Sequence, residues 1–224
     1  MSHSTFVINL ESRPDRLAKF VNGISDISGL EVFKAIRNAD HPNYGCVQSH
    51  KAILQLAKER GNEFCIIFED DATLRVPFDR LLAAVRELEV TPSKVDPSKV
   101  GWEILLFSAS EAFDTDDYIT LKDGTELVGV EHEFCGTYAM AVSCRAYDKL
   151  INYEVKLTDN VDIDVYSVAC AGRIWLTLPF MCYVLEGDQS DIRQVDTTDD
   201  LEHIKLGETR LVLKNSFMST LMVL

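Results

Sequence analysis

An apolar run that ends in three acidic residues constrains the fold of this chain most. Residues 64–68 read Phe-Cys-Ile-Ile-Phe and pass directly into Glu69, Asp70 and Asp71. A continuous apolar run of this length is typical of a strand buried on both faces, as in a parallel sheet covered by helices. The acids would then stand at the carboxyl edge of that sheet, which is where such proteins bind ligands.

Strand and helix patterns alternate on both sides of this run, and the second half of the chain is more mixed. The order predicts an α/β fold with a mostly parallel central sheet flanked by helices. The 224 residues fit a single domain over 1–224. The first predicted helix begins near residue 12 or 13, and the others cover residues 46–60, 77–88, 145–152 and 163–171. The predicted strands cover residues 5–10, 31–36, 64–68, 103–107, 118–121, 126–130, 134–142, 174–178 and 181–185.

The charge of the chain argues against polyanionic partners. Its formal net charge is −14, so it repels nucleic acids and acidic membrane surfaces, and we expect no nucleic-acid partner. We find no secretory signal, no CxxC pair and no apolar stretch of roughly 18 residues, and we therefore expect a cytoplasmic protein with reduced thiols and no transmembrane segment. The apolar tail 217–224 is expected to dock on the protein body, with peripheral membrane or partner contact as the alternative.

The acid triplet is the sharpest candidate for chemistry. Three adjacent carboxylates repel one another unless they are solvated or bound to a cation. If the chain is still extended there, Glu69 and Asp71 point one way and Asp70 the other. Mn²⁺ and Mg²⁺ prefer oxygen ligands of this kind, so the triplet indicates a divalent metal site, with a solvated acidic turn as the alternative.

Two polar clusters near the first and third predicted strands could contact an anionic ligand. Asn9, Arg13 and Arg16 follow the first strand and suit phosphate or a nucleotide, although a surface helix with paired charges explains them equally well. Ser49 and His50 are predicted in the first turn of the 46–60 helix, where backbone N–H groups favour anions. The alternative for His50 is a core histidine with a hydrogen-bond partner.

A third cluster lies late in the chain. Asp162 and Asp164 are candidates for a general base, and the alternative for Asp162 is the N-cap of the following helix.

Taken in order, these segments resemble glycosyltransferase family 25, over about residues 6–193, with 194–224 as a C-terminal extension. The resemblance implies a GT-A fold and transfer of a sugar with inversion. The donor would be a UDP-sugar, typically UDP-galactose, and the acceptor a hydroxyl on a glycan, lipopolysaccharide or glycoprotein. The pieces that carry it are Val7-Ile8-Asn9-Leu10 with Arg13 and Arg16; Gly45-Cys46 with Ser49-His50; Phe68-Glu69-Asp70-Asp71-Ala72; Gly136-Thr137-Tyr138-Ala139; Val161-Asp162; and Pro179 with Ser190-Asp191-Ile192.

The resemblance also assigns roles. Asp71, with Glu69, would bind Mn²⁺ or Mg²⁺, which holds the diphosphate, and Asp162 would be the base, with Asp164 in reserve. A late metal-ligating histidine, often present in GT-A enzymes, has only His203 as a candidate here, with Asp188, Gln189 and Asp191 as substitutes. The donor-contacting candidates are Asn9, Leu10, Arg13, Arg16, Ser49, His50 and Asp70.

Two other functions compete with this interpretation. A metal-dependent nucleotidyltransferase would need a Gly-rich phosphate cradle, and the sequence contains none. A non-catalytic sugar-binding or protein-binding module on the same fold would have lost the acid triplet or the base, and both are present. The stretch 111–131 matches nothing in the family pattern, and we expect acceptor choice to lie there.

Overall fold

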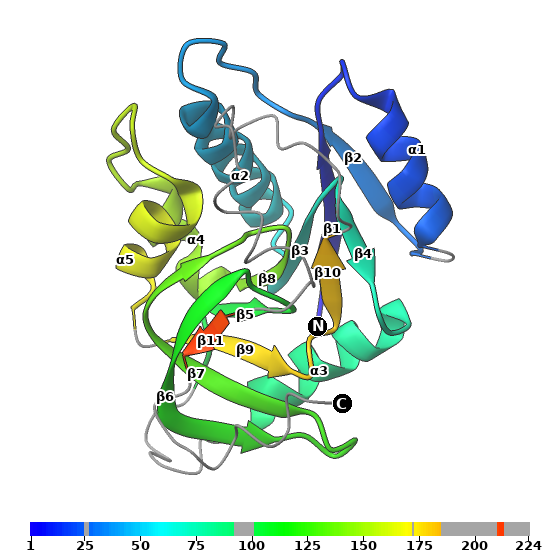
Figure 1. The fold of residues 1–224 in the computed structure, drawn as a ribbon, viewed down its shortest axis with the longest axis vertical. Helices are drawn as coiled ribbons and strands as arrows, with labels where there is room; N and C mark the ends of the chain where they lie inside the picture. Colours follow the sequence, from blue (N-terminus) through cyan, green and yellow to red (C-terminus); the bar gives the residue numbers. More distant parts are fainter. Residues whose placement is uncertain (25–26, 92–100, 172, 185–209, 213–224) are drawn as a thin grey trace.

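The structure, a computed structural model, describes residues 1–24, 27–91, 101–171, 173–184 and 210–212 (Figure 1). Helices cover both faces of one large sheet. The helical segments are α1 (Pro14–Gly23), α2 (Pro42–Glu59), α3 (Phe78–Val90), α4 (Cys144–Ile151), the π-helical turn η1 (Val161–Tyr166) and α5 (Ser167–Ala169). The strands are β1 (His3–Asn9), β2 (Leu30–Lys34), β3 (Phe64–Glu69), β4 (Ala72–Leu74), β5 (Ile104–Leu106), β6 (Glu111–Thr120), β7 (Glu126–Cys135), β8 (Ala139–Ser143), β9 (Ile174–Leu178), β10 (Cys182–Val184) and β11 (Arg210–Val212).

Nine of the described strands form one sheet in the order β11-β6-β7-β9-β5-β8-β3-β1-β2. The strands β2, β1 and β3 pair in parallel, so their carboxyl ends meet at one edge. Strand β8 lies antiparallel between β3 and β5, β5 and β9 pair in parallel, and β6, β7 and β9 pair antiparallel. The predicted α/β class with a helix-flanked central sheet is confirmed, with the parallel part around β1 and a mixed part beyond β8.

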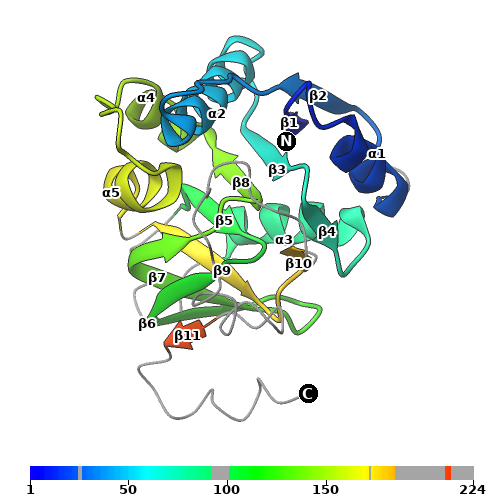
Figure 2. The same cartoon turned by 45° about the horizontal axis from the view of Figure 1, so that its top comes forward.

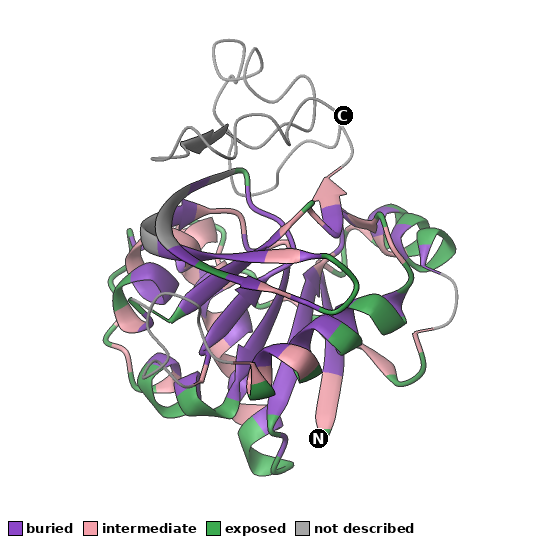
Figure 3. Cartoon of the chain, turned by 90° about the horizontal axis from the view of Figure 1, so that it is seen from below, coloured by how far each residue is buried: buried purple, intermediate pink, exposed green. Residues whose placement is uncertain are grey.

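Alternation along the strands builds a separate core on each face of the sheet. In β3, Phe64, Ile66 and Phe68 pack toward α1 and α3, whereas Cys65 and Ile67 pack toward α2, α4 and η1. Figure 2 shows α2, α4 and α5 gathered on one side, away from α1, and Figure 3 shows buried strands between helices with exposed outer faces. Each large apolar side chain that is removed from water contributes about 1.5–3 kcal/mol. The two-sided burial of β3 agrees with its continuous apolar sequence.

Helix α2 begins at Pro42, four residues earlier than predicted. Proline suits the first helical position because its fixed φ is already helical and its missing N–H has no intrahelical partner there. Ser49 and His50 therefore lie about two turns into the helix, and the prediction that they belong to its first turn is wrong. Because their backbone N–H groups are bonded within the helix, only the side chains of Ser49 and His50 are available to contact a ligand.

The single strand predicted over 134–142 is two strands, because β7 ends at Cys135 and β8 begins at Ala139. Gly136 breaks the run with a φ of +103°, a conformation that favours glycine. The helix predicted to begin at Ile163 instead begins with the π-helical turn η1 at Val161, so Asp162 lies inside it rather than at its N-cap.

Several expectations concern parts of the chain beyond the described residues. The tail 217–224 and the candidates Asp188, Gln189, Asp191 and His203 lie there. Within the described part, none of the helices combines the length and the apolar character that crossing a membrane requires. All six cysteines are free.

Candidate functional site

A cavity of about 220 Å³ opens where the parallel strands β1, β2 and β3 end. Its lining combines apolar and acidic side chains, a mixture typical of sites for ligands that carry both an apolar ring and charged groups. It is lined by Ile8, Leu10, Ser12, Arg16, Ala35, Ile36, Arg37, Asn38, Ala39, Pro42, Cys46, Ser49, Glu69, Asp70 and Asp71.

The acid triplet lines this cavity, and its backbone does not continue as an extended strand. Strand β3 ends at Glu69 and the chain turns at Asp70 and Asp71. Both aspartates therefore reach Arg16, whose Nε lies 2.8 Å from Asp70 Oδ1 and whose Nη2 lies 2.5 Å from Asp71 Oδ2. The expected alternation, with Asp70 opposite to Asp71, does not hold because a turn replaces the strand.

Asp70 is anchored inside the protein. Asn9 Nδ2 donates a hydrogen bond of 2.6 Å to Asp70 Oδ2, and a second one of 2.9 Å to the backbone oxygen of Arg13. Burial raises the pKa of Asp70 to about 6, although the Arg16 guanidinium opposes that shift. Asn9, Arg16 and Asp70 thus form one network, which joins the end of β1 to the end of β3 and to α1.

Glu69 is held from the turn between β7 and β8. Thr137 Oγ1 donates a hydrogen bond of 2.6 Å to Glu69 Oε1, and the Glu69 backbone N–H donates to the Tyr138 oxygen at 2.9 Å. Burial, followed by the nearby charges of Asp71 and Asp162, raises the pKa of Glu69 to about 8. The carboxylates of Glu69, Asp71 and Asp162 are therefore close enough to disfavour one another's ionisation.

Asp162 is connected to Glu69 through the same turn. Its Oδ2 accepts a 2.8 Å hydrogen bond from the Gly136 backbone N–H, next to the residue that binds Glu69, and its Oδ1 accepts one of 2.9 Å from Ile163. The Asp162 charge also acts on Glu69, so the two carboxylates lie within electrostatic reach of each other. The structure thus brings together three segments that are far apart in the sequence.

Other predicted site residues make mainly local contacts. Asp164 Oδ2 accepts a 2.7 Å hydrogen bond from the Asn160 backbone N–H. Arg13 pairs with Asp15 at 3.1 Å, as expected for a charge-paired surface helix. Leu10 lines the cavity directly. Their proposed roles in binding or catalysis stay predictions.

Ser49 fixes one wall of the cavity. Its hydroxyl accepts a 2.8 Å hydrogen bond from the Ile36 backbone N–H and donates one of 2.8 Å to the Gly45 oxygen. Gly45 lets the wall come close, because a Cβ there would lie 2.5 Å from the Ile36 oxygen and 3.0 Å from the Asn38 nitrogen. Helix α2 and the loop after β2 are therefore packed together at their backbones.

Gly45→Ala is expected to destabilise the protein by about 1–3 kcal/mol, because the added methyl group must push the loop at Ile36 away from α2. We expect a melting temperature several degrees lower and a weaker affinity for any ligand of the cavity. Thermal unfolding measures the first effect. Gly23→Ala is the control, since a Cβ at Gly23 meets nothing within 4 Å; equal melting temperatures for the two variants would contradict the close packing.

His50 is the most deeply buried candidate, with 1% of its surface exposed. Its Nδ1 lies 3.0 Å from the Tyr166 hydroxyl, and its Nε2 lies 4.0 Å from Glu69 Oε1, too far for a hydrogen bond. Burial lowers the pKa of His50 to about 3, so the ring is neutral at physiological pH. The expectation of a core histidine with a hydrogen-bond partner holds for Nδ1 but not for Nε2.

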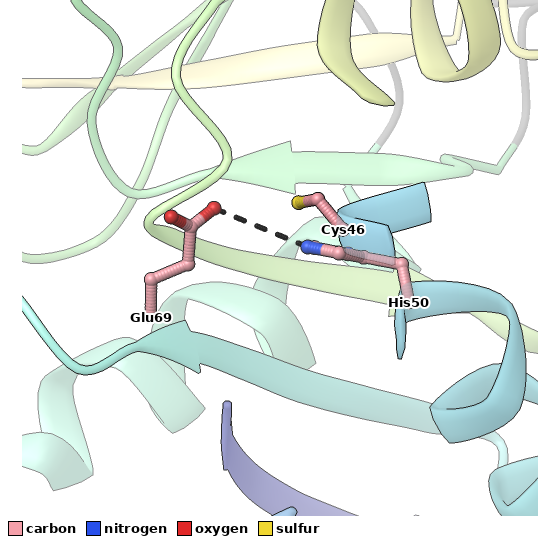
Figure 4. A group of neighbouring side chains, drawn as sticks. All are labelled: Cys46, His50 and Glu69. Carbon is pink, nitrogen blue, oxygen red and sulfur yellow. Dashed lines mark ion pairs between the residues drawn. The ribbon is translucent and has the colours of Figure 1, made fainter. Parts of the chain in front are cut away.

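The sequence analysis assigned no site role to Cys46, Thr137 or Tyr166, although Cys46 and Thr137 belong to segments that carry the family resemblance. Figure 4 shows Cys46 and His50 projecting from α2 toward the carboxylate of Glu69 at the end of β3. The spacing of Cys46 and His50, four residues apart on one helix, was the available signal. The contacts of Thr137 and Tyr166 could not be predicted locally, because their partners lie 68 and 116 positions away in the sequence.

The donor set fits a hard divalent cation in part. Glu69 and Asp71 offer oxygen ligands at the cavity, and Mg²⁺ or Mn²⁺ commonly takes one or two carboxylates together with phosphate oxygens and water. The crowding that raises the pKa of Glu69 is the kind that a cation relieves. Asp71 would have to share its Oδ2 with Arg16 or use its other oxygen.

A comparison with known protein families identifies the family of this chain. The sequence model of a family described as "Glycosyltransferase family 25 (LPS biosynthesis protein)" matches residues 41–165, more than half of the chain, and the family resemblance read from the sequence is confirmed. The matched range includes the triplet, the turn at Gly136 and Asp162, but not Asn9 or Arg16. No match to the chain is found among curated proteins.

Two solved structures show distant similarity. A197 from STIV is 13% identical, with a TM-score of 0.45, covering 83% of this chain and 86% of its own. A Thermus thermophilus protein titled mannose-1-phosphate geranyltransferase is 13% identical, with a TM-score of 0.40, covering 79% of this chain and 73% of its own. Similarity at this level does not bear on function.

Proposed function

The chain belongs to glycosyltransferase family 25, and on that premise we propose that it is a metal-dependent, inverting transferase that uses a UDP-sugar. The donor sugar we propose is galactose, and the acceptor is a hydroxyl on a glycan, lipopolysaccharide or glycoprotein. The observation that carries the proposal is the cavity at the ends of β1, β2 and β3, whose lining includes the acid triplet together with several apolar side chains. A GT-A arrangement of the nucleotide is part of the same proposal.

The apolar and the charged lining residues of the cavity suit the nucleoside and the diphosphate of a nucleotide, respectively. Ala35 and Ile36, which line the cavity after β2, offer an apolar surface for a base and a ribose. The diphosphate would lie toward the acid triplet, where Arg16 supplies positive charge in a chain of net charge −14. Arg37, which also lines the cavity, is a second candidate for a phosphate contact.

Glu69 and Asp71 would hold Mn²⁺ or Mg²⁺, with diphosphate oxygens and water as the remaining ligands. When bound, the ion supplies positive charge to the departing UDP. Arg16 keeps Asp70 and Asp71 in place, and Thr137 orients Glu69. These contacts preorganise the acidic side of the cavity before any ligand arrives.

Asp162 is the base that we propose. Two backbone N–H groups fix its carboxylate, and each oxygen retains a further lone pair to accept a proton from an acceptor hydroxyl. The link through Gly136 and Thr137 sets the position of Asp162 relative to Glu69. Asp164 is the reserve candidate, although its Oδ2 already accepts the Asn160 backbone N–H.

Thermal unfolding in the presence of nucleotides tests this function. UDP with Mn²⁺ should stabilise the protein by about 2.7 kcal/mol at a concentration of 100 Kd, while UDP alone and ATP with Mn²⁺ have little effect. A screen of nucleotide sugars for slow hydrolysis then identifies the donor. A response to ATP with Mn²⁺ would instead favour a nucleotidyltransferase, and no response to any nucleotide would favour a non-catalytic module.

A further inference from the structure

Three side chains of different chemistry converge beside the acid triplet. Cys46 Sγ, His50 Nε2 and a carboxylate oxygen of Glu69 all lie within 4.8 Å of one another (Figure 4). Cys46 and His50 are adjacent on one face of α2, and Glu69 follows Cys65 and Ile67 on the face of the sheet that packs against that helix. The cluster is thus built by the packing of α2 on β3.

The imidazole points at this cluster with a free nitrogen. His50 Nε2 is buried and has no hydrogen-bond partner, and its nearest charged atom is Glu69 Oε1 at 4.0 Å. A buried polar nitrogen without a partner is disfavoured, so this position of His50 Nε2 points to a ligand. A thiol and a carboxyl group at the same place are the companions that a metal ion requires.

Outer contacts already orient two of the three donors. The Tyr166 hydroxyl lies 3.0 Å from His50 Nδ1, where it can accept the ring N–H and leave the lone pair of Nε2 facing the cluster. Thr137 Oγ1 donates to Glu69 Oε1 at 2.6 Å. Metal-ligating histidines and carboxylates usually have such partners, which fix the tautomer and the ring plane.

The cluster is open on one side. Cys46 and Glu69 line the cavity at the strand ends, whereas His50 lies behind them with 1% of its surface exposed. An ion can therefore enter from the cavity and keep a fourth position there for water or an anion. Three protein ligands with one open position is a common arrangement for zinc in proteins.

We propose that Cys46, His50 and Glu69 bind one zinc-type divalent cation, at a site that shares Glu69 with the proposed donor metal site but otherwise goes beyond the proposed glycosyltransferase function. Thiolate and imidazole donors favour zinc over manganese or magnesium. A thiolate, a neutral imidazole and a carboxylate balance the two positive charges, so the site is neutral when filled, as burial requires. Donors around tetrahedral zinc lie roughly 3.3–3.8 Å apart, so the present spread closes by about 1 Å on binding.

Titration with metal ions in the absence of nucleotide tests the Cys46, His50 and Glu69 site by binding alone, without an activity measurement. Tag-free protein is titrated with Zn²⁺ by calorimetry, and with Co²⁺ by absorbance, where a thiolate-to-cobalt charge-transfer band reports the Cys46 bond directly. We expect one ion per chain in the wild type. Cys46→Ser and His50→Gln should each weaken binding by about 100-fold or more, exceeding the 10–100-fold loss typical of outer partners, and Tyr166→Phe should cost about tenfold.

Two variants serve as controls. Cys144→Ser removes an exposed thiol outside the cluster and should leave Zn²⁺ affinity unchanged. Asp71→Ala removes the one carboxylate that belongs to the proposed Mn²⁺ site alone and should keep Zn²⁺ binding, which distinguishes the two sites although both include Glu69. Unfolding curves of each variant establish that it is folded.

Each outcome of these titrations either supports or contradicts the proposed zinc site. Binding that depends on Cys46 and His50, but not on Cys144 or Asp71, supports the site. No binding to the wild type, a cobalt complex without thiolate absorption, or equal affinity in folded Cys46→Ser overturns it. Loss of Zn²⁺ binding in Asp71→Ala also overturns it, because the ion would then belong to the acid triplet. None of these results depends on whether UDP binds.

Discussion

Asp162→Asn is expected to lower sugar transfer by at least about 100-fold while UDP affinity stays within about twofold of wild type. The amide has nearly the same volume but cannot take a proton from the acceptor hydroxyl. Its single oxygen also replaces two that accept the N–H groups of Gly136 and Ile163, so a small loss of stability accompanies the change. Initial rates at saturating donor and calorimetry with UDP measure the two effects.

Asp159→Asn is the matched control. Asp159 is buried, whereas Asp162 is half-buried, and like Asp162 it accepts a backbone hydrogen bond: its Oδ2 accepts one of 2.8 Å from the Lys156 backbone N–H in the loop before η1. We expect its variant to lose stability but to keep the rate per folded molecule. A wild-type rate in Asp162→Asn would remove Asp162 from the chemistry, and loss of transfer in Asp164→Asn would then move the role to Asp164.

Asp71→Ala is expected to abolish the Mn²⁺-dependent part of UDP binding. Without this carboxylate, the cation would keep Glu69 as its main protein ligand, and the diphosphate would lose its bridge to the protein. Calorimetry with UDP, with and without Mn²⁺, measures the change. An unchanged Mn²⁺ dependence would remove the acid triplet from the mechanism.

The loss of the ion pair with Arg16 must be separated from this effect. Arg16 and Asp71 are largely buried and lie 2.5 Å apart, so the variant should also be less stable by about 1–3 kcal/mol. Asp148→Ala is the control for lost negative charge, since Asp148 pairs with Lys58 on the surface. It should leave both stability and UDP binding nearly unchanged.

The sequence predicted most of the fold because its strands and helices have strong local patterns. The strand 174–178 agrees residue for residue with β9, and the apolar run at 64–68 lies within β3. Errors arose where a single residue redirects the backbone. Pro42 starts α2 early, and Gly136 divides one apolar segment into two strands, since local conformational preference overrode hydrophobic pattern at these points.

The site was predictable only in part. The placement of the triplet at the end of β3 followed from the apolar run before it, and Cys46 and His50 share a helix face by their spacing. The pairing of Arg16 with both Asp70 and Asp71 did not follow, because it needs a turn where an extended chain was expected. Nor did any local signal connect Gly136 with Asp162, 26 residues away.

The sequence by itself determined the α/β class, the family and the acidic end of β3, because each of these follows from patterns within short segments and from the order of those segments along the chain. Only the tertiary structure decided which groups meet there. The insertion of β8 beside β3 brings the turn at Gly136 and Thr137 to Glu69, and the packing of α2 brings Cys46 and His50. Such contacts depend on how all the elements bury their apolar faces together, and no single segment encodes that arrangement.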